Sequence, residues 1–112
     1  MGLNAFDEHH PILRTLRALQ PQLHAAGVAH VSVFGSVARG EDTASSDVDL
    51  ALDLALDLAP GAAPEGFQFI LFIERLQQML ALALSRSVDV VILPARRREL
   101  REALGRDAIA VF

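Results

Sequence analysis

Apolar and polar residues alternate strictly from residue 47 to residue 58, which is the clearest pattern in the chain. Every second position is Val or Leu, and the positions between them include four aspartates, Asp47, Asp49, Asp53 and Asp57. A period of two places these two sets on opposite faces of a β-strand. The pattern predicts a strand that begins near Asp47 and ends between residues 54 and 58, before a loop rich in Pro, Gly and Ala at residues 60–66.

Three further segments have the composition of strands. Residues 28–34 and 88–93 are short apolar runs rich in Val, which favours extended structure. Gly35 follows the first run and Pro94 follows the second, and both residue types typically interrupt strands. Residues 109–112 are suited to a last short strand at the end of the chain.

Helical periodicity covers most of the remaining chain. Residues 8–26 repeat apolar side chains every three or four positions, with Pro11 suited to the first turn and Pro21 placed to kink or split the helix. Further helices are predicted at residues 36–40, a single turn, at residues 67–85, and at residues 96–104, closed by Gly105. The alternation of strands and helices indicates a single α/β or α+β domain over residues 1–112.

The segment at residues 67–85 predicts the longest helix, and it is apolar around much of its circumference. Most of its surface is therefore expected to be buried. A polar stripe follows one side, formed by Glu74, Gln77, Gln78 and Ser85. Of Phe67, Phe69 and Phe72, we expect two in the core and one outside, with an exposed apolar rim for a partner protein as the alternative.

The overall composition excludes several classes of protein. The 112 residues contain no Cys, which excludes disulfides, thiolate metal sites and thiol nucleophiles. A formal net charge of −4 argues against broad, sequence-independent nucleic-acid binding, which requires a basic surface. No uninterrupted apolar run approaches the ~20 residues that span a membrane, and the start lacks the order of a secretory signal. We expect a cytoplasmic protein with no membrane partner.

Candidate chemistry begins where the apolar run at residues 28–34 ends. Gly35 allows the backbone to turn sharply and to approach a ligand closely, and Ser36 opens a helical turn whose free N–H groups and hydroxyl favour an anion. On the next strand, Asp47 and Asp49 direct their carboxylates to one face, about 7 Å apart at Cα. Adjacent like charges are tolerated when a cation such as Mg²⁺ lies between them. The two halves together predict a site for a metal nucleotide.

Gly35-Ser36, ten intervening residues and Asp-x-Asp resemble the signature of the DNA polymerase β-like nucleotidyltransferase superfamily. The longer form, residues 35–40 with residues 46–50, is most similar to the minimal nucleotidyltransferases, or MNT proteins, which are typically antitoxin partners of HEPN-domain toxins. Residues 88–93 match the family strand that supplies a third carboxylate, here Asp89. The resemblance implies the nucleotidyltransferase fold, a mixed β-sheet with helices mainly on one face.

The same resemblance implies a role for each candidate residue. Catalysis and the binding of two Mg²⁺ ions with ATP would rest on three carboxylates, those of Asp47, Asp49 and Asp89. Asp89 would lie nearest the attacking group and could accept its proton. Gly35 and Ser36 would hold the terminal phosphates, and Arg39 would neutralise them further, with a merely solvated Arg39 as the alternative.

The remaining polar residues have simpler interpretations. Asp53 and Asp57 continue the polar face of their strand, and the run Arg96-Arg97-Arg98 is either a solvated face or a contact for an acidic partner. The four histidines have no spacing with carboxylates that favours a metal site. They are interpreted as helix caps or surface residues: His9, His10, His24 and His30.

Three functions are compatible with these features. The resemblance implies an Mg²⁺-dependent enzyme that transfers AMP from ATP to a tyrosine of a HEPN ribonuclease toxin and neutralises it. A second possibility is an antitoxin that acts by covering the toxin, for which the apolar helix at residues 67–84 is the cue. A third is an aminoglycoside nucleotidyltransferase, but such enzymes generally carry an additional helical domain, for which 112 residues leave no room.

Overall fold

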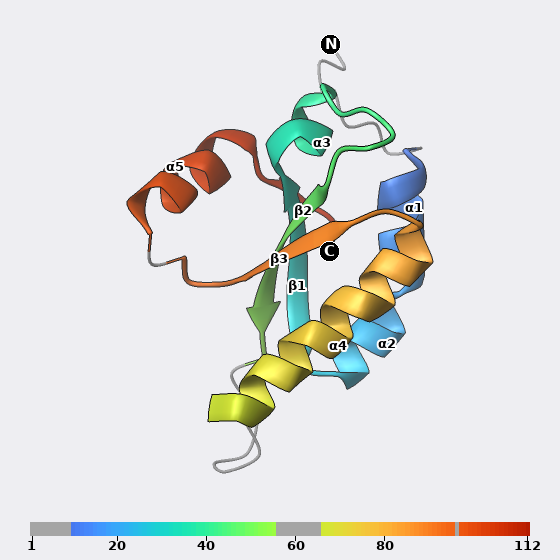
Figure 1. The fold of residues 1–112 in the computed structure, drawn as a ribbon, viewed down its shortest axis with the longest axis vertical. Coiled ribbons are helices and arrows are strands. Elements are labelled where there is room, and N and C mark those ends of the chain that lie inside the picture. The colour runs from blue at the N-terminus through green and yellow to red at the C-terminus, as the bar shows by residue number, and fades with distance from the viewer. Residues whose placement is uncertain (1–9, 56–65, 96) are drawn as a thin grey trace.

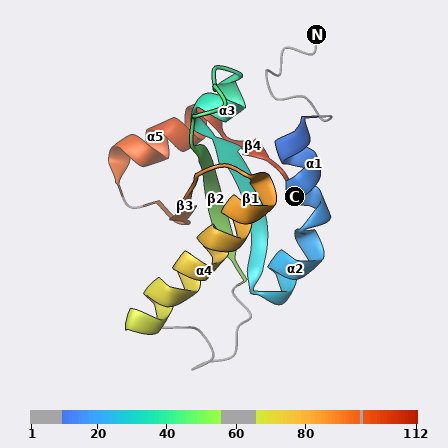
Figure 2. The same cartoon turned by 45° about the vertical axis from the view of Figure 1, so that its right-hand side comes forward.

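The structure is a computed structural model that describes residues 10–55, 66–95 and 97–112. Its centre is a four-stranded sheet of β1 (Val28–Phe34), β2 (Val48–Leu54), β3 (Val88–Ile92) and β4 (Ile109–Ala110), in the order β3-β2-β1-β4. Figure 1 labels the first three of these strands, and Figure 2 labels all four. The predicted loop at residues 60–66, except Gly66, and the possible end of the second strand at residues 56–58 lie outside the described residues.

The sheet is mixed, as the resemblance to the nucleotidyltransferase superfamily implies. β1 (Val28–Phe34) pairs antiparallel with β2 (Val48–Leu54) and with β4 (Ile109–Ala110). β2 pairs parallel with β3 (Val88–Ile92), which requires the crossover connection that α4 (Gly66–Leu84) provides. The first three strands lie within one residue of their predicted bounds, because apolar runs and strict alternation are strong strand signals.

The first predicted helix is divided into α1 (Pro11–Ala18) and α2 (Gln20–Ala25). The division falls next to Pro21, which lacks the N–H that a continuous helix would need. The Nδ1 atom of His10 accepts a hydrogen bond from the N–H of Ile12 at 3.1 Å, so the interpretation of this histidine as a cap is confirmed. Residues 8 and 9 lie outside the described part of the chain.

One hydrophobic core lies between the sheet and the helices α1, α2 and α4. These three helices lie together on one side of the strands, as Figure 1 and Figure 2 show from two directions. Leu50 and Leu52 of β2 are fully buried against this layer, and so are Leu16 of α1, Leu23 of α2 and Leu80 of α4. The polar face of β2 is thereby left on the opposite side, where the candidate site lies.

α4 is less buried than its composition predicts. Leu76 and Leu80 are its buried residues, and Phe67 is 73% exposed. Phe72 packs against the core, whereas Phe69 lies beside Phe72 with ring centroids 6.4 Å apart. The expectation of two core phenylalanines is therefore wrong. By length and composition alone, α4 is the one helix among the described residues that is long and apolar enough to cross a membrane.

α5 (Arg98–Asp107) differs from its prediction at both ends. It begins two residues after the predicted start at residue 96 and continues through Gly105, so this glycine does not close the helix. Nothing lies within 4 Å of the place that a β-carbon of Gly105 would occupy. The helix ends instead at Asp107, whose carboxylate is held by Arg39 and Arg106. Contacts with another part of the chain therefore determine where α5 ends, and the prediction that Gly105 ends this helix is wrong.

The C-terminal strand is shorter than the predicted residues 109–112. β4 contains Ile109 and Ala110, but the chain after it stays beside β1. The N–H of Val111 donates to the carbonyl oxygen of Val31 at 2.8 Å, and the carbonyl oxygen of Phe112 accepts from the N–H of Val31 at 3.3 Å. These bonds attach the end of the chain to the centre of the sheet.

Candidate nucleotide and metal site

The turn from β1 into α3 (Gly35–Arg39) brings the backbone against a carboxylate of the next strand. Phe34 is the antiparallel partner of Asp49, and Gly35 follows it directly. Gly35 has a φ of +73°, and a β-carbon at this position would collide with the Asp49 carboxylate. Only glycine is compatible with both the backbone angle and the lack of space. The close backbone approach that the sequence predicts is therefore directed at Asp49.

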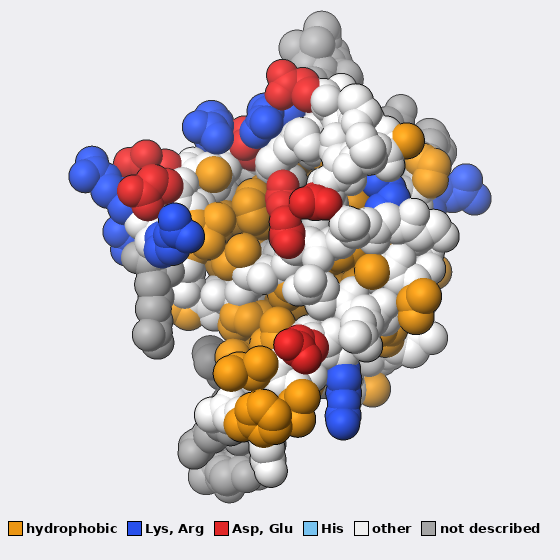
Figure 3. Space-filling model, viewed as in Figure 1, with side chains coloured by type: hydrophobic (Ala, Val, Ile, Leu, Met, Phe, Trp, Pro, Cys, Tyr) orange, Lys and Arg blue, Asp and Glu red, His pale blue; other side chains and the backbone are white. Residues whose placement is uncertain are grey.

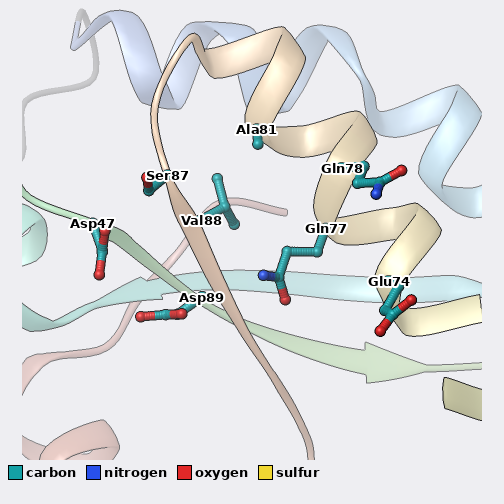
Figure 4. Close-up of a pocket in the computed structure, with 8 residues that line it drawn as sticks. All are labelled: Asp47, Glu74, Gln77, Gln78, Ala81, Ser87, Val88 and Asp89. Atoms are coloured by element: carbon teal, nitrogen blue, oxygen red, sulfur yellow. The ribbon is translucent and has the colours of Figure 1, made fainter. Parts of the chain in front are cut away.

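Two neighbouring strands bring the predicted acidic residues to one place. Asp49 of β2 and Asp89 of β3 are partners in the parallel register, so their side chains lie on the same face. Asp47 directly precedes β2 and lies two residues from Asp49. Figure 4 shows the side chains of Asp47 and Asp89 on adjacent segments at one end of a pocket. The structure therefore groups all three carboxylates around the start of β2.

The electrostatics of this group are those of crowded like charges. Burial raises the pKa of Asp49 above its ordinary value, Asp89 and then Asp47 raise this pKa further, and Arg39 opposes the shift. Each carboxylate thus makes it harder to ionise Asp49, and a bound cation would relieve this repulsion. Hard carboxylate oxygens are suitable ligands for Mg²⁺, which completes its coordination with water and phosphate oxygens.

The carboxylates are not arranged as a closed metal cage. Across the residues that the structure describes, no three Asp, Glu, His or Cys side chains are gathered closely enough to hold a metal ion as they stand. A site that takes part of its ligands from a nucleotide does not need such a cage, because the phosphates supply the missing oxygens. The donor set fits Mg²⁺ bound together with a nucleotide better than a structural ion.

Arg39 is bound by two carboxylates. Its Nε donates to Oε1 of Glu41 at 2.6 Å, and its Nη1 donates to Oδ2 of Asp107 at 2.7 Å. Asp107 is buried, and the hydrogen bonds from Arg106 and then from Arg39 hold its pKa below the ordinary value. Arg39 is therefore placed near Asp49 by a residue of α5. Sequence reasoning missed Asp107, because an acidic residue at a helix end carries no motif.

Arg86 is a second residue that sequence reasoning missed. It lies between α4 and β3, and its Nη1 donates to Oδ2 of Asp42 at 2.9 Å. Its Nη2 donates to the carbonyl oxygens of Thr43 and Ser46, both at 2.8 Å. The guanidinium thus fixes the loop that leads to Asp47. No local pattern reveals this contact, since the partners are about forty residues apart in the sequence.

A pocket of about 620 Å³ opens beside the carboxylates at β3, which is an edge strand of the sheet (Figure 4). Its far wall is α4, and it is lined by Asp47, Glu74, Gln77, Gln78, Ala81, Ser87, Val88 and Asp89. The polar stripe of α4 that the sequence indicates therefore lines this pocket at three of its four positions. Figure 3 shows carboxylates at the centre of this face of the molecule, with apolar side chains beside them.

Comparison with known proteins identifies the family. Residues 19–112 match the family model described as Polymerase beta, Nucleotidyltransferase. No curated protein matches the chain. A solved structure of a minimal nucleotidyltransferase is 34% identical, covers 90% of this chain and 97% of that chain, and superimposes with a TM-score of 0.61.

Two solved toxin–antitoxin structures are similar at lower identity. One, with AMP-PNP, is 23% identical with a TM-score of 0.62, and the match covers 88% of this chain and 72% of that chain. The other is a complex of a tri-AMPylated HEPN toxin of Shewanella oneidensis with an MNT antitoxin. It is 19% identical with a TM-score of 0.60, and the match covers 90% of this chain and 71% of that chain. These two likenesses show a shared fold. By its match over residues 19–112, the chain belongs to the polymerase β nucleotidyltransferase family.

Proposed function

We propose that this chain is an MNT-type antitoxin that transfers AMP from ATP to a tyrosine of its cognate HEPN ribonuclease toxin. The observation that carries the proposal is the approach of Gly35 to Asp49, with Asp89 in register on the adjacent strand. Support also comes from the solved structure in which an MNT antitoxin is bound to a tri-AMPylated HEPN toxin. The intact set of carboxylates favours an enzyme over an inactive relative.

The proposed step forms one bond and breaks one. A tyrosine oxygen attacks the α-phosphorus of ATP, a new O–P bond forms, the bond between the α-phosphorus and its bridging oxygen breaks, and pyrophosphate leaves. Asp89 would accept the phenolic proton or pass it to water. Mg²⁺, when bound, would neutralise the charge on the attacking and leaving oxygens.

Each candidate residue has one task in this scheme. Asp47, Asp49 and Asp89 would hold Mg²⁺. The N–H groups and the hydroxyl at Gly35 and Ser36 would bind the terminal phosphates, as the start of α3 leaves these groups free of helix partners. The charge of Arg39 would favour the phosphates while Asp107 keeps the guanidinium in place.

A specific observation supports a second candidate, an antitoxin that acts by binding alone. Phe67, Ile70 and Leu82 of α4 are 73%, 54% and 82% exposed, so one helix presents large apolar side chains to solvent. Such side chains are suited to a protein interface. In this case the nucleotide site would be unused or regulatory.

Nucleotide binding tests the site itself. Calorimetry with ATP is expected to give at least about tenfold weaker affinity in chelator than in Mg²⁺, because unscreened carboxylates repel the phosphates. Replacing Asp47 and Asp49 together by Asn should remove the metal-dependent part of the ATP affinity and leave the circular dichroism spectrum unchanged. Asp53→Asn is the matched control, since it lies farther along the same face of β2. Equal affinity in Mg²⁺ and in chelator would contradict the site.

Co-expression separates the two candidate functions. The cognate HEPN toxin should be neutralised by the wild-type chain, and a chain with Asp89→Asn should still bind the toxin in a pull-down but fail to restore growth. The reason is that Asp89 lies at the proposed chemistry and is not one of the exposed apolar residues that would form the interface. Equal rescue by both chains would favour neutralisation by binding.

A further inference from the structure

The pocket beside Asp89 lies across the carboxylates from the turn proposed to hold the phosphates. Gly35 and Ser36 follow β1, whereas the pocket residues belong to β3, α4 and the segment before β2. The strand order β3-β2-β1-β4 places Asp49 of β2 between these two regions. In-line transfer needs the attacking and the leaving oxygens on opposite sides of the phosphorus. The pocket therefore lies on the side from which an acceptor would approach.

The side-chain amide of Gln77 lines the pocket. The side chain of Gln77 extends from α4 towards β3, as Figure 4 shows, and it is half-buried. Within the ranges that the structure describes, Gln77 makes no hydrogen bond to the protein. An amide donates and accepts hydrogen bonds, so it can orient a hydroxyl group that enters the pocket.

The charge of the pocket limits what can enter it. Asp47, Glu74 and Asp89 line it, and no Lys or Arg residue that the structure describes is part of the lining. Even with a cation bound at the two aspartates, Glu74 remains as a negative charge on the far wall. An acidic lining repels the phosphates of a nucleic-acid acceptor and favours neutral or cationic groups.

The edge of the sheet makes the pocket accessible to a peptide. β3 pairs with β2, and no other described strand pairs with it, so one row of its backbone groups is unpaired. An extended peptide can lie along such an edge and place alternate side chains towards the sheet face. A protein acceptor fits this edge better than a rigid small molecule does.

We propose that this pocket is the acceptor subsite, in which the Gln77 amide orients a tyrosine hydroxyl and Glu74 selects for basic residues beside that tyrosine. The inference rests on the proposed AMP transfer and adds the chemistry of the acceptor segment to it. Gln77 and Glu74 are thus specificity-determining residues that no sequence motif of the chain includes.

A peptide titration tests the pocket without any transfer reaction. The full chain, loaded with Mg²⁺ and AMP-PNP, is titrated with the peptide Ala-Arg-Tyr-Arg-Ala while the side-chain amide resonances of its glutamines are followed by NMR. The Gln77 amide should shift, and the amide of Gln68, on the same helix but outside the pocket, should not. Peptides with Phe in place of Tyr, or with Glu in place of Arg, should bind at least about threefold more weakly.

Two results of this titration would overturn the inference. In the first, the Gln77 amide shifts on addition of AMP-PNP and then does not respond to peptide, which would make the pocket a nucleobase site. In the second, the Gln77 amide responds neither to AMP-PNP nor to the peptide, up to the solubility limit of each ligand. Because no step depends on transfer, either result stands even if AMP transfer is never observed.

Steady-state transfer to the cognate toxin provides the second test. Gln77→Leu should raise KM for the toxin about tenfold, the loss of roughly one hydrogen bond, and leave the Kd for Mg²⁺-ATP within about twofold. Gln68→Leu is the matched control and should change neither. An unchanged KM with active wild-type enzyme would refute the acceptor subsite alone, whereas a wild type that binds Mg²⁺-ATP and transfers nothing would refute the proposed function.

Discussion

The backbone of Gly35 and the carboxylate of Asp49 occupy adjacent space, so a change at either residue affects the other. This pair of residues connects the turn that is proposed to bind the phosphates with the carboxylates that are proposed to bind Mg²⁺. Sequence reasoning anticipated a glycine that lets the backbone approach a ligand. It did not anticipate that the nearest group is a protein carboxylate, because a contact between β1 and β2 depends on strand register.

Gly35→Ala is expected to destabilise the fold by about 1–3 kcal/mol, because φ of +73° is strained for alanine and the new methyl group displaces Asp49. The loss is measured by urea denaturation. Gly105→Ala is the matched control: this glycine lies inside α5 with open space around it, and alanine should stabilise by about 0.5–1 kcal/mol. Equal effects of the two substitutions would contradict the described packing.

Asp49→Asn should raise the melting temperature in chelator, and the gain should grow with pH. Because the pKa of Asp49 is raised in the folded state, its contribution to stability is present below the unfolded pKa of about 4 and is lost as pH rises through the folded value. The asparagine variant has no such loss. Melting curves at several pH values between about 4 and 8 measure the difference.

Addition of Mg²⁺ should reverse this order. A cation between the carboxylates favours their ionised form, so Mg²⁺ should raise the melting temperature of the wild type more than that of Asp49→Asn. Equal responses of both chains to Mg²⁺ would show that Asp49 does not contribute to metal binding.

At the scale of elements, the site depends on segments between the strands. The loop before β2 is fixed by Arg86, and α3 is attached to α5 by the Arg39–Asp107 ion pair. Both contacts join segments that are more than thirty residues apart in the chain. They keep Asp47 and Arg39 in place although neither lies inside a strand.

Arg86→Lys is expected to cost about 2 kcal/mol of stability, since lysine keeps the charge but loses the fork that reaches Asp42 and two carbonyl oxygens. The affinity for Mg²⁺-ATP should also fall severalfold, because the loop that carries Asp47 is released. Denaturation and calorimetry measure the two effects. Arg101→Lys, at an exposed position of α5, should change neither. Loss of stability with full nucleotide affinity would make Arg86 a structural residue only.

The elements themselves could largely be predicted from the sequence. The strands at residues 28–34 and 47–54 follow from local patterns of apolar residues, and Pro21 marked the division between α1 and α2. The end of α5 could not be predicted, because Asp107 is held by Arg39 from another part of the chain. The exposure of Phe67 could not be predicted either, since composition does not tell how much of a helix the sheet can cover.

The candidate site shows the same division. A local motif predicts roles for Gly35, Ser36, Asp47 and Asp49, and the family resemblance of residues 88–93 adds Asp89; these roles stay predictions. The residues that surround them, Arg86 and Asp107, depend on contacts that only the fold creates. The stripe of Glu74, Gln77 and Gln78 was visible as a pattern, but its place in the wall of the pocket was not.

At the scale of the whole molecule, the proposed chemistry lies at an open edge of the sheet. The acidic pocket is bounded by α4 on one side and is open on the other, so an acceptor has to bring its own binding surface. The exposed apolar residues of α4 belong to the same helix as the pocket wall. A docked protein could therefore contact both.

The chain contains no Tyr, so it cannot place AMP on a tyrosine of its own. AMP found on tyrosine in a mixture of this chain and its toxin must therefore be on the toxin. This property makes the mass of the toxin an unambiguous measure of the proposed reaction.

The central claim is tested most directly by the intact mass of the cognate HEPN toxin after incubation with this chain, ATP and Mg²⁺. The wild-type chain should increase the toxin mass by one or more AMP units, with the modification on tyrosine. Asp89→Asn should bind the toxin but leave its mass unchanged, because the residue lies in register with Asp49 at the proposed chemistry. A toxin that is neutralised equally by both chains and keeps its original mass would contradict AMP transfer as the function.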